Sequence, residues 1–164
     1  MANTYTQCYL HLVFAVRRRD ALIHKSWKPE LEKYITGIVQ SHEHKMLAIG
    51  GMPDHIHVFL GYDVKQTIPK LVEEIKTSSN RWISKNNFTP YKFDWQNGYG
   101  AFTHARSQLD TVVNYVLNQE EHHKQKTFRD EYLAMLIKNE VEFKEEYLFD
   151  FFDETYDWHL PQNK

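Results

Sequence analysis

The first half of the chain alternates between two hydrophobic periods. Residues 5–16 are rich in aromatic and β-branched types that partly alternate with other positions, which predicts a strand. In residues 26–43, apolar side chains recur every three or four positions after a proline, which predicts a helix. Two further strands are predicted at 45–49 and 54–60. The Gly-Gly-Met-Pro stretch 50–53 between them predicts the turn of an antiparallel hairpin.

The second half continues with mainly helical spacing. Residues 67–85 place apolar side chains on one face of a predicted helix and basic side chains on the other. A polar loop follows over 86–98, and a fourth short strand is predicted at 99–103. Helical spacing returns over 107–121 and again over 127–140. Both of these segments begin with a Ser/Thr-x-x-Asp sequence, which has the form of a capping box.

The order of these elements predicts the fold class. The first six follow the β-α-β-β-α-β pattern of a ferredoxin-like fold, an α+β arrangement of one antiparallel sheet with helices on one face. The remaining helices are added at the C-terminal end. We therefore expect one domain over residues 1–140, and an acidic, aromatic tail over residues 141–164.

Composition places the chain among folded proteins without a membrane segment. Its 164 residues are 41% hydrophobic and 15% aromatic, which is enough for one substantial core. No apolar run approaches the roughly 18 residues of a membrane span, and the N-terminus does not resemble a signal peptide. Cys8 is the only cysteine, so a disulfide framework and a cysteine-based zinc site are excluded. We expect a cytoplasmic protein.

Charge is distributed unevenly along the chain. The net charge is −2, but residues 1–139 hold 18 basic and 14 acidic side chains, whereas residues 140–164 hold 2 and 8. Any polyanion would therefore be bound by local basic clusters and not by overall charge. We expect the tail to pack on the body or on a partner through its aromatic side chains, which are Tyr147, Phe149, Phe151, Phe152, Tyr156 and Trp158.

Two histidines on the third predicted strand form half of a candidate metal site. Because strand side chains alternate, His55 and His57 share one face while Ile56 points to the other. They would supply at most two ligands, and they could equally be ordinary core or surface histidines. Asp54 could orient one of the two rings or serve only the start of the strand.

The predicted helix 107–121 offers the remaining candidates. Tyr115 and Gln119 are i, i+4 neighbours on one edge of its apolar stripe, in line with Gln108 and His122. A tyrosine there could be a packing residue, and Gln119 a solvated amide. His122 and His123 could be extra ligands, DNA contacts or a solvated helix end, and His104 beside Arg106 is similarly open.

Three segments together resemble a known family. Met-Pro-Asp-His-Ile-His over 52–57 contains the His-hydrophobic-His signature of HUH nucleases. Residues 95–102 (Trp-Gln-Asn-Gly-Tyr-Gly-Ala-Phe) and 115–123 (Tyr-Val-Leu-Asn-Gln-Glu-Glu-His-His) look like the small single-tyrosine transposases of bacterial insertion sequences, the IS200-like transposases. The resemblance covers roughly residues 4–135, so the domain 1–140 would be a catalytic domain that includes the tyrosine helix.

The resemblance implies a mechanism for these residues. His55, His57 and Gln119 would bind a divalent ion, magnesium or manganese, and no nucleotide cofactor would be needed. Tyr115 would attack the scissile phosphate of single-stranded DNA, leaving a 5′-phosphotyrosine link and a free 3′-hydroxyl. Because the link conserves the phosphodiester energy, strands could be rejoined without ATP. Mixed imidazole and amide ligands suit an exchangeable, harder ion better than structural zinc.

The resemblance also implies partners. The chain would form a homodimer with composite active sites, the tyrosine helix docking in cis or in trans, and its substrate would carry hairpins near the element ends. From charge alone, DNA backbone contacts are predicted for Arg17, Arg18, Arg19, Lys76, Arg81 and Lys85. Two alternatives are a domesticated HUH endonuclease that processes repeated palindromes and a non-catalytic module that binds structured nucleic acid.

Overall fold

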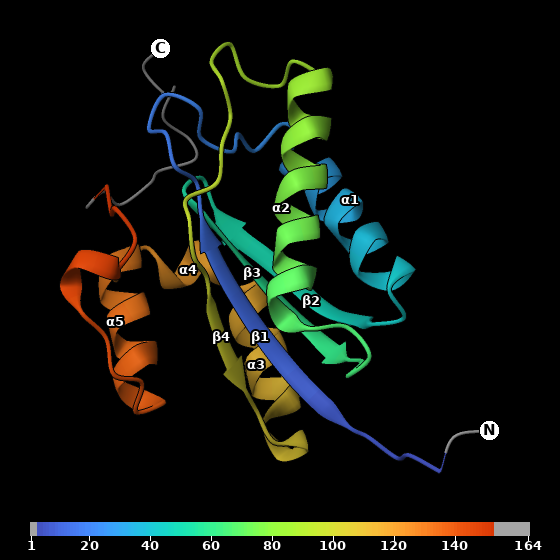
Figure 1. Cartoon of the computed structure of the whole chain (residues 1–164). Coiled ribbons are helices and arrows are strands. Elements are labelled where there is room, and N and C mark those ends of the chain that lie inside the picture. Colours follow the sequence, from blue (N-terminus) through green and yellow to red (C-terminus); the bar gives the residue numbers. More distant parts are fainter. Residues whose placement is uncertain (1–2, 153–164) are drawn as a thin grey trace.

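A computed structural model describes residues 3–152 and contains one four-stranded sheet (Figure 1). The strands are β1 (Cys8–Ala15), β2 (Lys45–Met52), β3 (His55–Tyr62) and β4 (Gly100–Thr103). They lie in the order β2-β3-β1-β4, and all neighbours are antiparallel. The predicted ferredoxin-like fold is confirmed.

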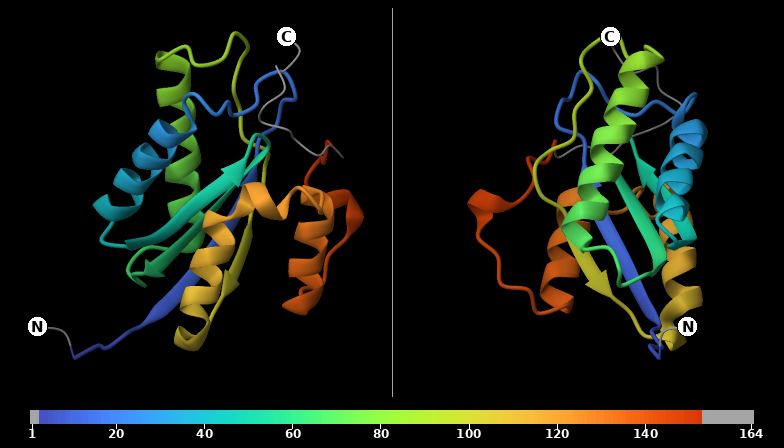
Figure 2. Two further views of the ribbon diagram at one scale, coloured as in Figure 1. Left: turned by 180° about the vertical axis from the view of Figure 1, so that it is seen from behind. Right: turned by 45° about the vertical axis from the view of Figure 1, so that its right-hand side comes forward.

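Two helices cover one face of this sheet. Figure 2 shows α1 (Lys28–Ser41) and α2 (Ile68–Lys85) together on one side. Helix α2 begins where predicted, because the Thr67 hydroxyl accepts a hydrogen bond from the Lys70 amide. The main core lies between these helices and the sheet, and its buried members include Leu12, Phe14, Leu31, Ile35, Val58, Leu71 and Ile75.

The C-terminal helices cover the opposite face of the sheet. After the short 3₁₀ turn Arg106–Gln108 come α3 (Leu109–Leu117), α4 (Gln119–His122) and α5 (Phe128–Lys138). A second 3₁₀ turn, Glu145–Tyr147, follows in the tail. In Figure 2, α3 and α5 lie on the same side of the sheet and α4 joins them. Within the described residues, no helix is long and apolar enough to cross a membrane.

The predicted helix 107–121 is interrupted at Asn118, whose φ of −104° and ψ of 32° end α3 and begin α4. Its predicted capping box is also wrong, because α3 has no side-chain cap; instead, the Gln108 side chain accepts a hydrogen bond from the Ala105 amide. The cap predicted for the next helix is confirmed, because the Thr127 hydroxyl accepts from the Asp130 amide.

The turn predicted at 50–53 is too long. Strand β2 continues through Gly50 and Gly51 to Met52, and only the next two residues form the turn. A Cβ atom on Gly50 would lie 2.2 Å from the carbonyl oxygen of Val116 in α3. The missing side chain therefore serves the close approach of a helix to the strand, and not a change of chain direction.

The tail packs against the body only in part. Phe149 and Phe151 contact Phe128 and Tyr132 of α5, which confirms the prediction for these two residues. The Phe152 carbonyl and ring meet the Arg19 guanidinium. Tyr147 is 79% exposed and therefore not buried against the body, and its packing on a partner stays a prediction. Tyr156 and Trp158 lie outside the described residues.

Candidate active site

Strand β3 carries the two predicted histidines at the centre of the sheet. His55 and His57 are fully buried and face the C-terminal helices, while Ile56 and Val58 point into the core beneath α1 and α2. The predicted alternation is confirmed. Because the strand lies between β1 and β2, both imidazoles have fixed backbone positions.

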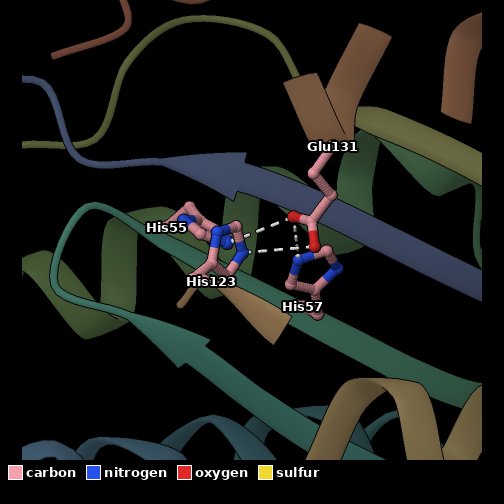
Figure 3. A group of neighbouring side chains, drawn as sticks. All are labelled: His55, His57, His123 and Glu131. Atoms are coloured by element: carbon pink, nitrogen blue, oxygen red, sulfur yellow. Dashed lines mark hydrogen bonds and ion pairs between the residues drawn. The ribbon is translucent and has the colours of Figure 1, made fainter. Parts of the chain in front are cut away.

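Four buried side chains from three parts of the chain converge above this strand (Figure 3). They are His55, His57, His123 and Glu131, and their ligand atoms lie within 4.8 Å of one another. One Glu131 oxygen lies 2.9 Å from His57 Nε2 and 3.4 Å from His55 Nε2. The other lies 3.2 Å from His123 Nε2. The carboxylate of α5 is thus the centre of the cluster.

Tyr115 and Gln119 reach the same cluster from α3 and α4. The Tyr115 hydroxyl donates a short hydrogen bond to Glu131. The Gln119 carbonyl oxygen lies 3.3 Å from His55 Nε2 and 3.0 Å from His123 Nε2, while its amide donates to the backbone carbonyl of Tyr115. All four residues predicted for catalysis and metal binding therefore meet in one place, on one chain.

The outer ring nitrogens of the histidines are engaged elsewhere, which turns the inner ones toward the centre. His55 Nδ1 lies 2.7 Å from the Asp54 carboxylate, and His123 Nδ1 lies 2.8 Å from the Lys126 carbonyl. Both nitrogens must donate, so each Nε2 points inward, where it can offer a lone pair to a cation once it carries no proton. Two such nitrogens, a carboxylate and an amide oxygen together form a donor set suited to a divalent cation.

His11 of β1 extends the cluster beneath His57. Its Nε2 and the Nδ1 of His57 share a hydrogen bond of 2.8 Å, and the two rings stack. Burial lowers the pKa of both His11 and His57, although Glu131 opposes the shift. Both imidazoles are therefore neutral near pH 7, the state that a metal ligand requires.

The pKa values of His55, Glu131 and Tyr115 are strongly shifted. Burial works against a charged His55, but Asp54 and Glu131 together raise the pKa of His55 to about 9. Burial would raise the pKa of Glu131, but the surrounding histidines hold it well below its usual range. Burial and the Glu131 charge raise the pKa of Tyr115 well above its ordinary value. Without a bound cation, the phenol therefore stays protonated.

Sequence reasoning missed Glu131 and left His123 open. Glu131 shares the buried face of α5 with Phe128 and Tyr132, and a carboxylate among apolar positions at helical spacing was the available signal. Of the two adjacent histidines, His123 is buried in the cluster, whereas His122 is 33% exposed beside the Tyr115 ring.

The basic residues predicted to contact DNA lie in two groups. At the end of β1, Arg17 pairs with Asp94, Arg18 with Asp20, and Arg19 meets the tail. On α2, Arg81 and Lys85 are exposed.

Lys76 differs from the other basic residues of α2. Its ammonium donates to the backbone carbonyls of Gln96 and Gly98, at 2.8 and 2.6 Å, and burial lowers its pKa to about 8. It ties the loop before β4 to the helix. Its contact with DNA, like that of the other five, stays a prediction.

Comparison with known proteins identifies the family. The family model described as "Transposase IS200 like" matches residues 4–119. The chain therefore belongs to the IS200-like transposase family, the family that its motifs resemble. The matched region ends at Gln119, so His123 and Glu131 lie beyond it. No curated protein matches the chain.

Two solved structures share the fold. A protein assigned as a transposase from Deinococcus radiodurans aligns with a TM-score of 0.57 at 22% identity, over 73% of this chain and 95% of its own. A REP-associated tyrosine transposase bound to a REP hairpin aligns with a TM-score of 0.52 at 12% identity, over 99% of this chain and 91% of its own.

Proposed function

We propose that this chain is a metal-dependent transposase that cleaves and rejoins single-stranded DNA at insertion-sequence ends through Tyr115. The observation that carries the proposal is the hydrogen bond from the Tyr115 hydroxyl to Glu131, the same carboxylate that touches the buried histidines. A nucleophile and a candidate metal site in direct contact are what phosphoryl transfer requires.

The proposed cleavage step is a transesterification. The Tyr115 oxygen attacks phosphorus, and the bond between phosphorus and the 3′ oxygen breaks. The phenol proton passes to the Glu131 carboxylate, which already accepts it in a hydrogen bond. The 3′ oxygen leaves and takes up a proton, which Glu131 returns through solvent, and the DNA remains attached to Tyr115 through its 5′ phosphate. Attack by a 3′-hydroxyl reverses the step and rejoins strands.

The residues that would hold the ion are His55, His57, His123, Glu131 and Gln119. When bound, a divalent ion would supply positive charge to the scissile phosphate and to the leaving 3′ oxygen. Imidazole and carboxylate donors together suit manganese better than magnesium, which prefers oxygen ligands and water. We therefore expect Mn²⁺ to support cleavage better than Mg²⁺.

A second candidate function is the processing of repeated palindromes by the same chemistry. The solved transposase bound to a REP hairpin aligns with 99% of this chain, so it covers the C-terminal helices as well as the sheet. Hairpin DNA is therefore the partner we propose in either case. A fixed hairpin that is cleaved but never rejoined would favour this second candidate, whereas rejoining supports the first.

The proposal also covers the domain boundary, the DNA contacts and the oligomeric state. Residues 1–140 would form the catalytic domain, since they contain every member of the cluster. Arg17, Arg18, Arg19, Arg81 and Lys85 would contact the DNA backbone, together with Lys76. We also propose a homodimer for the full chain.

An adduct assay tests the function. The protein is incubated with Mn²⁺ and a library of single-stranded DNA in which a fixed hairpin is flanked by random sequence, and covalent complexes are separated in denaturing gels. We expect an adduct with the wild type, none with Tyr115→Phe, and an undiminished one with the control Tyr147→Phe. No adduct with any divalent ion, or an adduct that survives Tyr115→Phe, would contradict the proposal.

A further inference from the structure

A cleft opens beside the nucleophile, and His55 is not among the residues that line it. It has a volume of about 300 Å³ and is lined by residues of β1, β4, α3 and α5, with Tyr115 and Glu131 in its wall. This size is at the lower end of small-ligand sites, which span roughly 300–1,000 Å³. It is far too small for a DNA duplex.

Helix α5 presents a distinct stripe to this cleft. Glu131, Ala134, Met135 and Lys138 line it at helical spacing, while the buried face of α5 packs on the sheet and the tail. Phe102 and Met135 line the cleft and also belong to the apolar cluster that holds α5 in place, whereas Ala134 and Lys138 lie outside that cluster. Ala134 and Lys138 can therefore change without removing that core.

The floor and the rim of the cleft differ in chemistry. Phe102 and Val112 are buried at its floor beside Met135. Lys126 and Lys138 are exposed at its edge, and neither forms an ion pair within residues 3–152. An apolar floor with an aromatic ring suits a nucleobase, and two unpaired ammonium groups suit a phosphate.

His104 adds a polar group to the wall. Its Nε2 is buried and has no hydrogen-bond partner within the described part of the chain. Burial lowers the pKa of His104 and outweighs a hydrogen bond with Gln108 that raises it, while the Lys138 charge adds to the lowering, so the ring is neutral. A buried polar atom without a partner is unfavourable, and a ligand that bonds to it would remove that penalty.

We propose that this cleft binds a single nucleotide of the DNA strand, the one joined to Tyr115 through its 5′ phosphate. The base would lie against Phe102 and Met135, and Lys126 and Lys138 would face the phosphate backbone. The proposal rests on the proposed function, because it takes Tyr115 as the nucleophile. In this proposal, residues of α3 and α5 select the base next to the cleaved bond.

Nucleotide binding to the metal-free protein tests the cleft by itself. The four deoxynucleoside 5′-monophosphates are titrated in EDTA, which removes any metal–phosphate contact, and binding is measured by calorimetry and by NMR shifts of Met135 and Ala134 methyl groups. We expect at least one nucleotide to bind, and to bind more tightly than inorganic phosphate or the matching nucleoside alone. Equal binding of phosphate alone, or no nucleotide binding, overturns the proposal.

Two variants and two controls locate the binding. Ala134→Phe fills the cleft and Lys138→Glu reverses its rim charge; each should weaken nucleotide binding about tenfold or more, corresponding to about 1.4 kcal/mol. Ile137→Phe, on the exposed side of the same helix, and Lys33→Glu, on α1, should leave it unchanged. Unchanged binding in both cleft variants overturns the proposal, and Lys138→Glu, a surface change, keeps the test valid should Ala134→Phe fail to fold.

The adduct assay distinguishes failure of the cleft proposal from failure of the proposed function. If a Tyr115-dependent adduct forms but no nucleotide binds, the cleft proposal is wrong and the function stands. If nucleotide binding follows the variants but no adduct forms, the function is wrong while the binding site stands.

Discussion

Glu131 is the residue that joins the parts of the site. It accepts a hydrogen bond from Tyr115 and lies within 3.4 Å of His55, His57 and His123. Burial of the phenol together with the negative charge of Glu131 holds the phenol protonated when no cation is present, and the same charge attracts a cation. One side chain therefore couples metal binding to the readiness of the nucleophile.

Glu131→Gln should separate these effects. The amide keeps the size of the side chain but removes its charge. Loss of a residue that only orients a metal ligand lowers metal affinity roughly 10- to 100-fold. We expect Mn²⁺ affinity to fall by at least this much and the adduct to disappear. Affinity is measured by calorimetry, with the exposed Glu142→Gln as control. Wild-type Mn²⁺ affinity in Glu131→Gln would show that this carboxylate is not a ligand.

Metal affinity should also depend on pH through His55. With a pKa of about 9 in the metal-free protein, His55 carries a proton at pH 7 that a metal must displace. Affinity for Mn²⁺ should therefore rise between pH 7 and about 9, by up to about tenfold per unit, and then level off.

Asp54→Asn provides the comparison for this pH dependence. Removing the carboxylate beside His55 lowers its pKa, so the rise should be complete at lower pH, although the loss of an orienting partner also weakens binding. Titrations across pH 6.5–9.5 measure both curves. A flat wild-type curve would show that His55 is neutral before the metal binds.

At the scale of elements, two glycines set the positions of the helices that carry the site. A Cβ on Gly50 would meet the Val116 backbone of α3, and one on Gly100 would lie 2.8 Å from the Tyr132 ring of α5. The helices can approach the sheet only where these strands have no side chain. The distance from Tyr115 and Glu131 to the strand histidines therefore depends on both glycines.

Gly50→Ala should displace α3 from the sheet. We expect a loss of stability of about 1–3 kcal/mol, measured by urea denaturation, together with loss of the DNA adduct. Gly37→Ala is the matched control. It adds the same methyl group to α1, where nothing lies within 4 Å, and should stabilise the protein by about 0.5–1 kcal/mol. Equal effects of the two substitutions would contradict this account.

The elements themselves could be predicted from hydrophobic period, whereas contacts between distant segments could not. The order of strands and helices and the facing of His55 and His57 follow from local alternation. Gly50 looked like part of a turn because the helix that requires it lies more than 50 positions later in the sequence. Gly51 is required by the close approach of His55 and Ile56 in the next strand. Glu131 lies 74 positions from its partner His57, and no local pattern reports such a contact.

At the scale of the whole molecule, the site is assembled from one chain. Tyr115 and Gln119 reach the histidine and glutamate cluster of their own chain. Helix α5 closes the cluster, because the Phe128 ring stacks on His55 at a centroid distance of 3.8 Å. If α3 and α4 alone docked on a partner, the contact between Tyr115 and Glu131 would have to break. If α5 and the tail moved with them, that contact and the packing of the tail on α5 would be retained.

A mixing experiment decides between docking in cis and in trans. Tyr115→Phe keeps the histidines, and His57→Ala keeps the tyrosine, so a dimer that exchanged helices would contain one complete site. If sites assemble in cis, a mixture of the two variants forms no adduct, even after they are co-expressed or unfolded and refolded together. Co-purification of differently tagged copies shows whether mixed dimers are present. The absence of an adduct supports docking in cis only if they are. Recovery of an adduct in proportion to the mixed dimer would show that the tyrosine helix docks on the partner's strand.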